Sequence, residues 1–166
     1  FFHLAAYFAN QNSVVHPKED LLVNGLGTLK LLEFSQKFNV KKFIYSSSSC
    51  VYGNKSGLMS EESSEYRPDT PYAITKLLGE RYVNFFYKQH KLNTIILRYF
   101  NSYGPGEFPG EYRNVIPNFL WLAMNKKPLP ITGTGEETRD FTYVGKTVML
   151  TLLAGEKDNA IGETIN

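Results

Sequence analysis

The segment Lys41-Lys42-Phe43-Ile44-Tyr45-Ser46 has the short apolar centre of a strand buried on both faces of a sheet, and further serines follow it. Before it, residues 18–38 carry leucines near helical spacing and begin just after Pro17, which a first helical turn tolerates. After it, residues 71–90 form a second expected helix with a proline at its start. Residues 94–98 are again apolar and predict the next buried strand.

Segments on both sides continue this alternation. The chain is expected to open with the end of a strand at residues 1–6, and the later segments predict a helix at 116–125, a strand at 129–132, a helix at 144–154 and a strand-like end at 163–166. Residues 53–70 and 103–110 contain glycine and proline and are expected to be irregular. Alternating strands and helices predict an α/β fold whose parallel sheet carries helices on both faces.

The composition is that of an ordinary globular protein. Hydrophobic residues make up 42% and charged residues 20%, and the net charge is +2, so neither a nucleic acid nor a membrane is expected as a partner. Cys50 is the only cysteine, which excludes an internal disulfide and favours a reducing compartment. No apolar run approaches the ~20 residues of a membrane span, and no signal peptide is recognisable. We expect a cytoplasmic protein.

Both ends of the chain have the character of internal strands. The first residue is Phe1 rather than an initiator methionine, and the last four residues are again strand-like. We therefore expect this sequence to be a fragment of a longer protein.

The carboxyl edge of the sheet is where a ligand is expected, because open parallel sheets bind ligands where their strands end. The residues that follow three of the expected strands are small, polar or expose their backbone, as suits contact with a ligand. They are residues 3–6, 46–49 and 99–101.

Tyr72 and Lys76 are the strongest candidates for catalytic chemistry. Residues four apart share a helix face, so a phenol and an ammonium can point into one cleft. A free tyrosine has a pKa of ~10, and a neighbouring cation favours its phenolate. Bringing this pKa near 7 requires roughly 4 kcal/mol, which a desolvated site with two cations could supply and one exposed ion pair could not. The alternative is an exposed helix pair without a role.

The serines at 46–49 are candidates to orient a substrate. A hydroxyl at the end of this strand could hydrogen-bond a substrate hydroxyl and direct its proton toward Tyr72. The alternative is a polar loop that forms side-chain turns. Cys50 comes next, and because no basic residue is obviously near, we expect a quiet buried thiol.

Several separated motifs occur in a fixed order and cover nearly the whole chain. They are His3-Leu4-Ala5-Ala6, Asn24 with Gly27-Thr28, Phe43 to Ser48, Val51-Tyr52-Gly53, Pro71 to Lys76, and Arg98-Tyr99-Phe100-Asn101. The set resembles the extended short-chain dehydrogenase/reductases, NAD-dependent epimerases and dehydratases, and most closely their UDP-glucose 4-epimerase-like group. The resemblance implies a partial Rossmann-like doubly wound parallel sheet at residues 1–100. It implies part of a smaller C-terminal substrate-binding domain, with late elements of the fold, at residues 101–166.

By this resemblance, Ser48, Tyr72 and Lys76 are the catalytic residues. Tyr72 would be the general base for a sugar hydroxyl, while Lys76 would bind the nicotinamide ribose and lower the Tyr72 pKa. The residues implied to contact NAD are Leu4, Ala5, Ala6, Asn24, Ser46, Ser47, Tyr72, Lys76 and Tyr99. For Asn24, a helix residue that hydrogen-bonds the backbone is an equally good interpretation.

The second half of the chain resembles the side that binds a nucleotide-diphosphate sugar. The residues implied to contact this substrate are Ser48, Asn101, Asn114, Val115 and Arg139, and no metal is expected. Asn114 and Val115 stand at a helix start, whose N–H groups form a natural anion site. Arg139 would fork onto phosphate or ribose oxygens, and the alternative is a surface ion pair with Asp140 or Glu137.

One family feature is missing, namely the Gly-rich phosphate turn that opens a dinucleotide-binding fold. Gly25-Leu26-Gly27 lies inside a helical pattern, and Gly133-Thr134-Gly135 lacks a third glycine and the preceding first strand. The turn would lie before Phe1. The residues present are therefore expected to bind NAD weakly or not at all on their own.

The residues Ser48-Ser49-Cys50 favour epimerisation over the family's other reactions. The dehydratases resemble Thr-Asp-Glu at these positions and the decarboxylases Thr-Ser-Glu, and neither Ser49 nor Cys50 replaces a carboxylate. We expect a UDP-glucose 4-epimerase-like enzyme that transiently oxidises a sugar hydroxyl and works as a homodimer through its two long helices. The alternatives are another nucleotide-sugar enzyme (a dehydratase, decarboxylase or reductase), a non-catalytic member, or a truncated inactive product.

Overall fold

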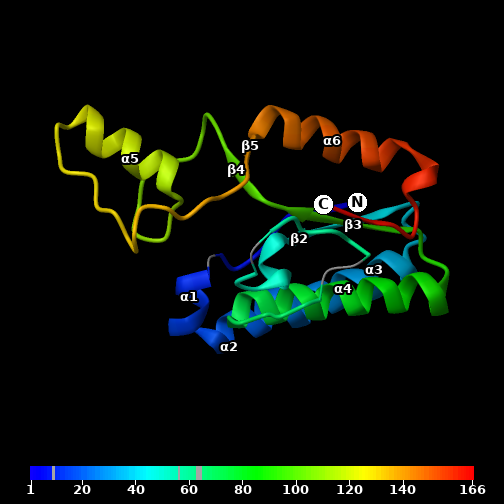
Figure 1. The fold of residues 1–166 in the computed structure, drawn as a ribbon. Helices are drawn as coiled ribbons and strands as arrows, with labels where there is room; N and C mark the ends of the chain where they lie inside the picture. Colours follow the sequence, from blue (N-terminus) through cyan, green and yellow to red (C-terminus); the bar gives the residue numbers. More distant parts are fainter. Residues whose placement is uncertain (9, 56, 63–64) are drawn as a thin grey trace.

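A parallel sheet forms the centre of the computed structural model, which describes residues 1–8, 10–55, 57–62 and 65–166. Its four strands lie in the order β1-β2-β3-β6, so chain order and spatial order agree (Figure 1). The strands are β1 (Phe2–His3), β2 (Phe43–Ser48), β3 (Thr94–Tyr99) and β6 (Thr164–Ile165). The parallel α/β sheet expected from the sequence is confirmed.

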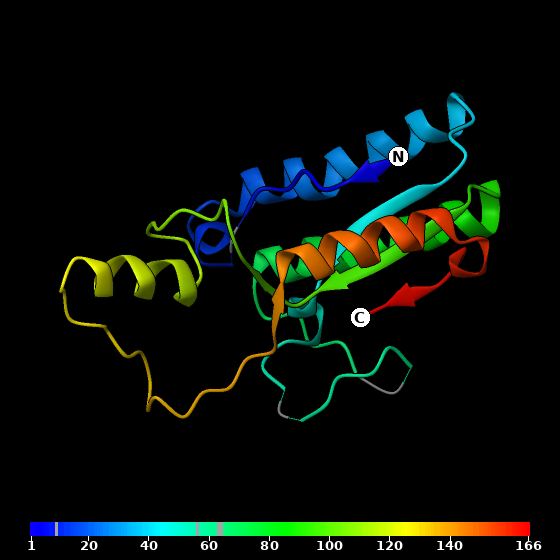
Figure 2. The ribbon, with the colours of Figure 1, turned by 90° about the horizontal axis from the view of Figure 1, so that it is seen from above.

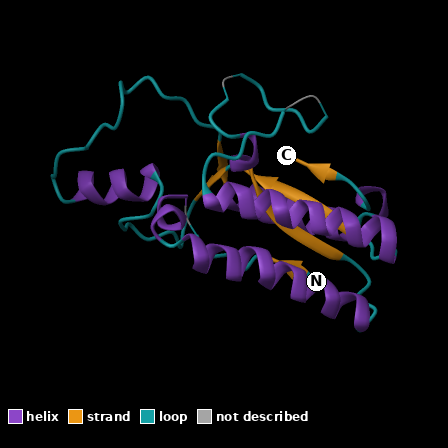
Figure 3. Cartoon of the chain, turned by 90° about the horizontal axis from the view of Figure 1, so that it is seen from below, coloured by secondary structure: helices purple, strands orange, loops and turns teal. Residues whose placement is uncertain are grey.

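Helices cover both faces of this sheet. One face carries α4 (Pro71–His90) and a helical run of three parts (Figures 1 and 3), and the other carries α6 (Val144–Glu156) (Figure 1). The three parts are α2 (Pro17–Asp20), the π-helical segment η1 (Leu21–Leu26) and α3 (Gly27–Lys37). The helices expected at 18–38, 71–90 and 144–154 are therefore present, and the sheet is doubly wound.

The start of α4 is fixed by local chemistry. The Thr70 side chain accepts a hydrogen bond from the Ala73 N–H, and Pro71 occupies the first helical turn. At the other end, Lys91 adopts a left-handed conformation and its N–H bonds to the Phe86 carbonyl. These two caps set the helix that carries Tyr72 and Lys76.

The two faces of β2 and β3 pack into separate cores, because successive strand residues point to opposite sides. Phe43, Tyr45 and Ile96 pack with helix residues such as Leu32 and Val83 on the α3 and α4 side. On the other side, the buried residues are Ile44, Ile95, Leu97, Ala154 and Ala160. Burial on both faces explains why residues 43–45 of β2 and 95–97 of β3 are apolar without interruption.

Three elements between residues 101 and 143 form a second group beside the sheet. β4 (Asn101–Tyr103) pairs in parallel with β5 (Phe141–Tyr143), and α5 (Val115–Met124) extends to one side (Figure 2). The expected helix at 116–125 is present. Shorter elements that the sequence did not predict are α1 (Asn10–Val15), η2 (Ser49–Tyr52) and η3 (Asp158–Ala160).

The strand expected at residues 129–132 is wrong. These four residues are exposed and adopt no regular structure, and Ile131 is 70% exposed. A strand requires a neighbouring ladder, and no described segment pairs with this one. The apolar residues that suggested a strand lie on a connection to β5.

The lengths and side chains of the helices bear on whether any of them could span a membrane. None in the described part of the chain combines the length and the apolar character needed to cross a bilayer. The longest, α4, has 20 residues and carries charged side chains along its length.

Candidate active site

A cavity of about 360 Å³ opens at the carboxyl edge of the sheet, where the sequence predicted a ligand site. Residues from several separated segments meet in its wall. They are Phe8, Asn10, Gln11, the run 46–50, Tyr72, the run 99–102, Tyr112 and Asn114. The ends of β2 and β3 thus face the start of α4 across a shared space.

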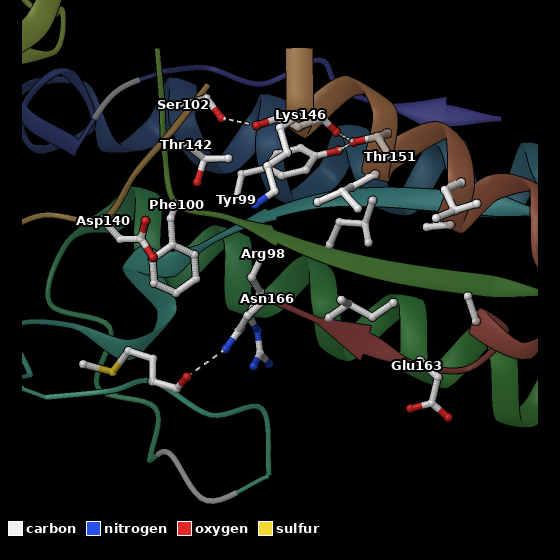
Figure 4. Close-up of a pocket in the computed structure, with 18 of the residues that line it drawn as sticks. Arg98, Tyr99, Phe100, Ser102, Asp140, Thr142, Lys146, Thr151, Glu163 and Asn166 are labelled. Atoms are coloured by element: carbon white, nitrogen blue, oxygen red, sulfur yellow. Dashed lines mark hydrogen bonds between the residues drawn. The ribbon is translucent and has the colours of Figure 1, made fainter. Parts of the chain in front are cut away.

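A second, larger cavity of about 990 Å³ lies on the α6 side of the sheet (Figure 4). Arg98, Tyr99, Lys146 and Thr151 are among its lining residues, but neither Tyr72 nor any of residues 46–48 takes part. Size alone does not identify a reactive site. The phenol of Tyr72 and the serines at 46–48 meet in the wall of the smaller cavity.

Tyr72 and Lys76 lie on the same face of α4, and both are buried, with 9% and 3% of their surfaces exposed. The Lys76 Nζ is 5.6 Å from the centroid of the Tyr72 ring and 5.3 Å from that of Tyr45. It donates a hydrogen bond of 2.7 Å to the carbonyl of Ser46 at the end of β2. Helical spacing and this bond hold the ammonium between the phenol and the strand end.

Burial raises the pKa of the Tyr72 phenol, and a hydrogen bond with Ser48 opposes this effect. Burial also lowers the pKa of Lys76, to about 8. The lowering of the Tyr72 pKa that the sequence led us to expect is therefore not found in the protein alone. The Lys76 ammonium points at the Ser46 carbonyl, and the loss of hydration of a buried phenolate outweighs its attraction. A phenolate needs additional positive charge in this cavity.

The three serines at the end of β2 have different partners. Ser48 Oγ accepts the N–H of Cys50 and caps η2, and its side chain reaches Tyr72. Ser46 offers its carbonyl to Lys76. Ser47 points the other way and donates to Glu80 Oε1 at 2.5 Å, so its hydroxyl is already used inside the protein. Of these three serines, Ser48 is the one whose side-chain hydrogen bond opposes the raised pKa of Tyr72.

The Asn24 side chain makes all of its hydrogen bonds within the protein. Its Oδ1 accepts the N–H of Tyr7 at 2.7 Å, and its Nδ2 donates to the Tyr7 carbonyl and to Asp20 Oδ2. No amide donor is left for a ligand, which supports the alternative interpretation of a backbone-bonding helix residue. Asn24 positions the loop that leaves β1.

That loop carries three residues expected to face NAD, Leu4, Ala5 and Ala6. Leu4 and Ala5 are exposed and Ala6 is half-buried, so the stretch is accessible beyond the carboxyl end of β1. Tyr99, also expected to contact NAD, lines the cavity but directs its hydroxyl to Thr151 on α6 at 2.7 Å (Figure 4).

Besides Ser48, two of the residues expected on the substrate side line the same cavity as Tyr72. The Asn101 side chain donates to the Asp140 carbonyl at 3.0 Å, and Asn114 Nδ2 donates to Glu107 at 3.1 Å. Asn114 makes no side-chain cap, so the first N–H groups of α5, from Val115 on, are not capped by it.

Arg139 stands apart from this group. It is exposed, is absent from the lining of the cavity, and donates to the neighbouring Thr138 carbonyl. Neither alternative ion pair, with Asp140 or with Glu137, forms among the described residues. Glu137 instead accepts the N–H groups of Thr134 and Gly135.

Sequence reasoning missed the contribution of the α1 region. Asn10 lies in the cavity wall, where its Nδ2 donates to Cys50 Sγ at 3.2 Å and its Oδ1 accepts from Thr70. Phe8 packs edge-on against the Tyr72 ring, with 6.4 Å between the two ring centroids. Neither residue belongs to a periodic pattern. The available signal was their position just after the strand that ends at His3.

His3 gives the protein a predicted acid sensitivity. Burial, and secondarily the charge of Lys76, lowers its pKa from 6.5 to about 4, and its Nε2 bonds to Thr28 Oγ1 at 2.9 Å. The unfolded chain therefore binds the extra proton first, so this stability is present above pH 6.5 and is lost as the pH falls toward 4. As the pH falls from 6.5 to 4, the free energy of unfolding of the wild type should decrease by about 3 kcal/mol more than that of His3→Gln, as measured by urea unfolding. The exposed His16→Gln serves as control, and parallel curves for all three proteins would contradict the prediction.

The doubly wound sheet with Ser48, Tyr72 and Lys76 at its carboxyl edge has the features of the extended short-chain dehydrogenase/reductase class. The model of the NAD dependent epimerase/dehydratase family matches residues 1–166. The chain belongs to this family, which is NAD-dependent.

Known relatives agree with this assignment. The chain is 54% identical to an epimerase from Methanothermobacter thermautotrophicus, with a TM-score of 0.95 over 99% of this chain and 50% of that one. It is 37% identical to the Bacillus cereus UDP-glucuronic acid 4-epimerase solved with UDP-glucuronic acid and NAD, with a TM-score of 0.90 over 99% and 52%. A putative UDP-glucose 4-epimerase of Methanocaldococcus jannaschii is 35% identical over 96% of this chain and 52% of its own length. The chain thus spans about half the length of these relatives.

Proposed function

We propose that the protein is an NAD-dependent nucleotide-sugar epimerase, similar to the UDP-glucose 4-epimerases, that transiently oxidises a sugar hydroxyl. The carrying observation is that Tyr72 and Ser48 share one cavity wall while the buried Lys76 ammonium lies 5.6 Å from the Tyr72 ring centroid. Tyr72 would take the hydroxyl proton and later return it, and Ser48 would orient that hydroxyl. Epimerases named for UDP-glucose and UDP-glucuronic acid are among the similar proteins.

The residues present fit a dinucleotide at the strand edge. An ammonium has three donors, and Lys76 makes one hydrogen bond among the described residues, so it retains donors for ribose hydroxyls. The accessible loop at Leu4, Ala5 and Ala6 and the carboxyl end of β2 at Ser46 and Ser47 would line the cofactor. Bound NAD would supply the hydride acceptor and a positive charge in the cavity.

The nucleotide-diphosphate sugar would lie beside the cofactor-binding residues 1–100, on the side of residues 101–166, which we propose as part of the substrate-binding region together with late elements of the fold. Asn101 and Asn114 line the cavity, and the N–H groups of α5 from Val115 offer an anion site. Arg139 would reach the phosphate or ribose only by leaving its bond to the Thr138 carbonyl.

The lining of the cavity favours epimerisation over the second candidate, dehydration. Dehydratases acting on dTDP-D-glucose are also among the relatives. Elimination of water needs an extra acid and base, and no Asp or Glu stands among the described lining residues. Ser49 and Cys50 occupy the wall where such carboxylates would be required.

A product assay tests the reaction. The full-length protein that contains these residues is incubated with NAD and UDP-sugars, and the products are analysed by NMR and mass spectrometry. Epimerisation inverts one carbon and leaves the mass unchanged, whereas dehydration loses water and decarboxylation loses carbon dioxide. A product of lower mass would replace the epimerase assignment, and the absence of any product across UDP- and dTDP-sugars would defeat it.

We further propose a cytoplasmic homodimer that associates through its two long helices. Apolar side chains are exposed along this helical layer, including Leu22, Leu26, Ile74 and Phe85. Their arrangement suits burial against a second copy. Sedimentation velocity on the wild type and on Phe85→Glu measures this directly, and a wild type that sediments as a monomer would refute it.

A further inference from the structure

A buried carboxylate lies behind the proposed catalytic residues and takes no part in the chemistry described above. Asp20 ends α2, and 0% of its surface is exposed. Its Oδ1 accepts the hydroxyl of Thr75 at 2.5 Å, and its Oδ2 accepts Nδ2 of Asn24 at 2.9 Å. No described Lys, Arg or His lies within ion-pair distance of it. Burying a carboxylate without a paired cation costs folding free energy, so the presence of Asp20 at this position needs an explanation.

The partner of Asp20 lies within the turn of α4 that carries the catalytic side chains. Thr75 comes three residues after Tyr72 and directly before Lys76, and its hydroxyl also lies 3.1 Å from the Tyr72 carbonyl. Asp20 therefore connects α2 to the backbone of this turn. Ser13 makes a similar contact from α1, because its Oγ accepts the Tyr72 N–H at 3.0 Å.

Asp20 is the carboxylate with the largest effect on Lys76 among the described groups around it, ahead of Cys50. The titratable groups that face or influence Lys76 are Tyr72 of its own helix, Tyr45 of β2, His3 of β1, Cys50 of η2 and Asp20 of α2. His3 is neutral near pH 7, because burial and then the charge of Lys76 lower its pKa to about 4. Glu80, the other buried carboxylate near Tyr45, is occupied by Arg98.

We propose that Asp20 is a positioning residue, which holds the Tyr72–Lys76 turn through Thr75 and provides the counter-charge that keeps the buried Lys76 ammonium protonated. Burial raises the pKa of Asp20, and the hydrogen bonds from Thr75 and Asn24 and then the Lys76 charge oppose this effect. Burial lowers the pKa of Lys76 to about 8, and the Asp20 carboxylate is the first influence that opposes it. Its importance for turnover rests on the proposed function. The structural claim, that Asp20 sets the charge of Lys76, does not.

Asp20→Asn separates charge from hydrogen bonding. An Asn at this position can accept from Asn24 through its oxygen and donate to Thr75 Oγ1 through its amide, while the Thr75 proton goes to the Tyr72 carbonyl. The contacts are kept and the charge is removed. Thr75→Ser is the matched control, because it keeps both the hydroxyl and the carboxylate.

The readout is the titration of Lys76, followed through the ¹³Cε resonance of ¹³C-labelled lysine and assigned by its absence in Lys76→Arg. The midpoint should fall by about one pH unit in Asp20→Asn and stay unchanged in Thr75→Ser. A midpoint equal to that of the wild type in folded Asp20→Asn would overturn the proposal. The Asp20 carboxyl resonance of the wild type gives a second measurement that requires no variant, and a protonated carboxyl at pH 7 would overturn it equally.

This experiment is independent of the enzymatic assignment. If Asp20→Asn shifts the Lys76 titration while no nucleotide sugar is converted, the counter-charge stands and the epimerase proposal fails. If sugars are converted and the Lys76 titration is unmoved, the epimerase proposal stands and the role of Asp20 fails.

Discussion

Tyr72→Phe is expected to lower the turnover of a nucleotide sugar by about 10³-fold, within the range that general acid–base groups contribute. The phenyl ring preserves the packing against Phe8 and the contact with the Lys76 ammonium, which both involve the ring itself. Only the hydroxyl that faces the cavity is lost. The substrate KM should therefore change little, because the removed group acts on the proton in the transition state.

The control for this substitution is Tyr82→Phe on the same helix. Tyr82 is half-buried, packs against the core on the α3 and α4 side, and is absent from the lining of the cavity. Its variant should retain turnover within about twofold of the wild type, since it loses a hydroxyl outside the site. Steady-state kinetics on the three proteins decide the matter. Unchanged turnover in Tyr72→Phe would remove the proposed mechanism.

The main strands and the long helices could be predicted because their signals are local. β2 and β3 are buried on both faces, so their apolar runs appear directly in the sequence. The start of α4 is marked by Thr70 and Pro71, a capping residue followed by a proline in the first turn. Tyr72 and Lys76 share a face for the same local reason, their spacing of four.

The features that could not be predicted depend on contacts between distant segments. Residues 129–132 have the composition of a strand, yet pairing requires a neighbour that sequence alone does not reveal. The Asn24 side chain can donate and accept hydrogen bonds, as a ligand-binding residue must. Only the fold shows that Tyr7 and Asp20 occupy its amide oxygen and both of its amide N–H donors.

The raised pKa of Tyr72 has the same origin. The spacing of four shows that the charge of Lys76 lies near Tyr72. The burial of the phenol, which raises the Tyr72 pKa, comes from packing against distant parts of the chain such as Phe8 and η2. Spacing establishes which groups can meet. It does not establish the dielectric environment in which they meet.

Glu80→Gln is expected to destabilise the protein by about 4 kcal/mol, or about 10 °C in Tm for a chain of this length. Arg98 binds Glu80 through two parallel bonds of 2.8 and 2.7 Å, and the exposed fractions of the two side chains are 1% and 3%. Glu80 also accepts the Ser47 hydroxyl. Neutralising the carboxylate leaves a buried guanidinium without a counter-charge, because its remaining partners are the neutral hydroxyls of Tyr52 and Tyr66.

The exposed pair of Arg67 with Glu65 provides the matched comparison, since both side chains are about two-thirds exposed, at 68% and 67%, and the bond length is the same 2.7 Å. Glu65→Gln should cost less than about 1 kcal/mol, because water and salt screen this pair. The double variant Glu80→Gln/Arg98→Met should be more stable than Glu80→Gln alone, as no charge is then left buried. Equal losses for Glu80→Gln and Glu65→Gln in thermal and urea unfolding would show that the buried pair does not hold β3 to α4.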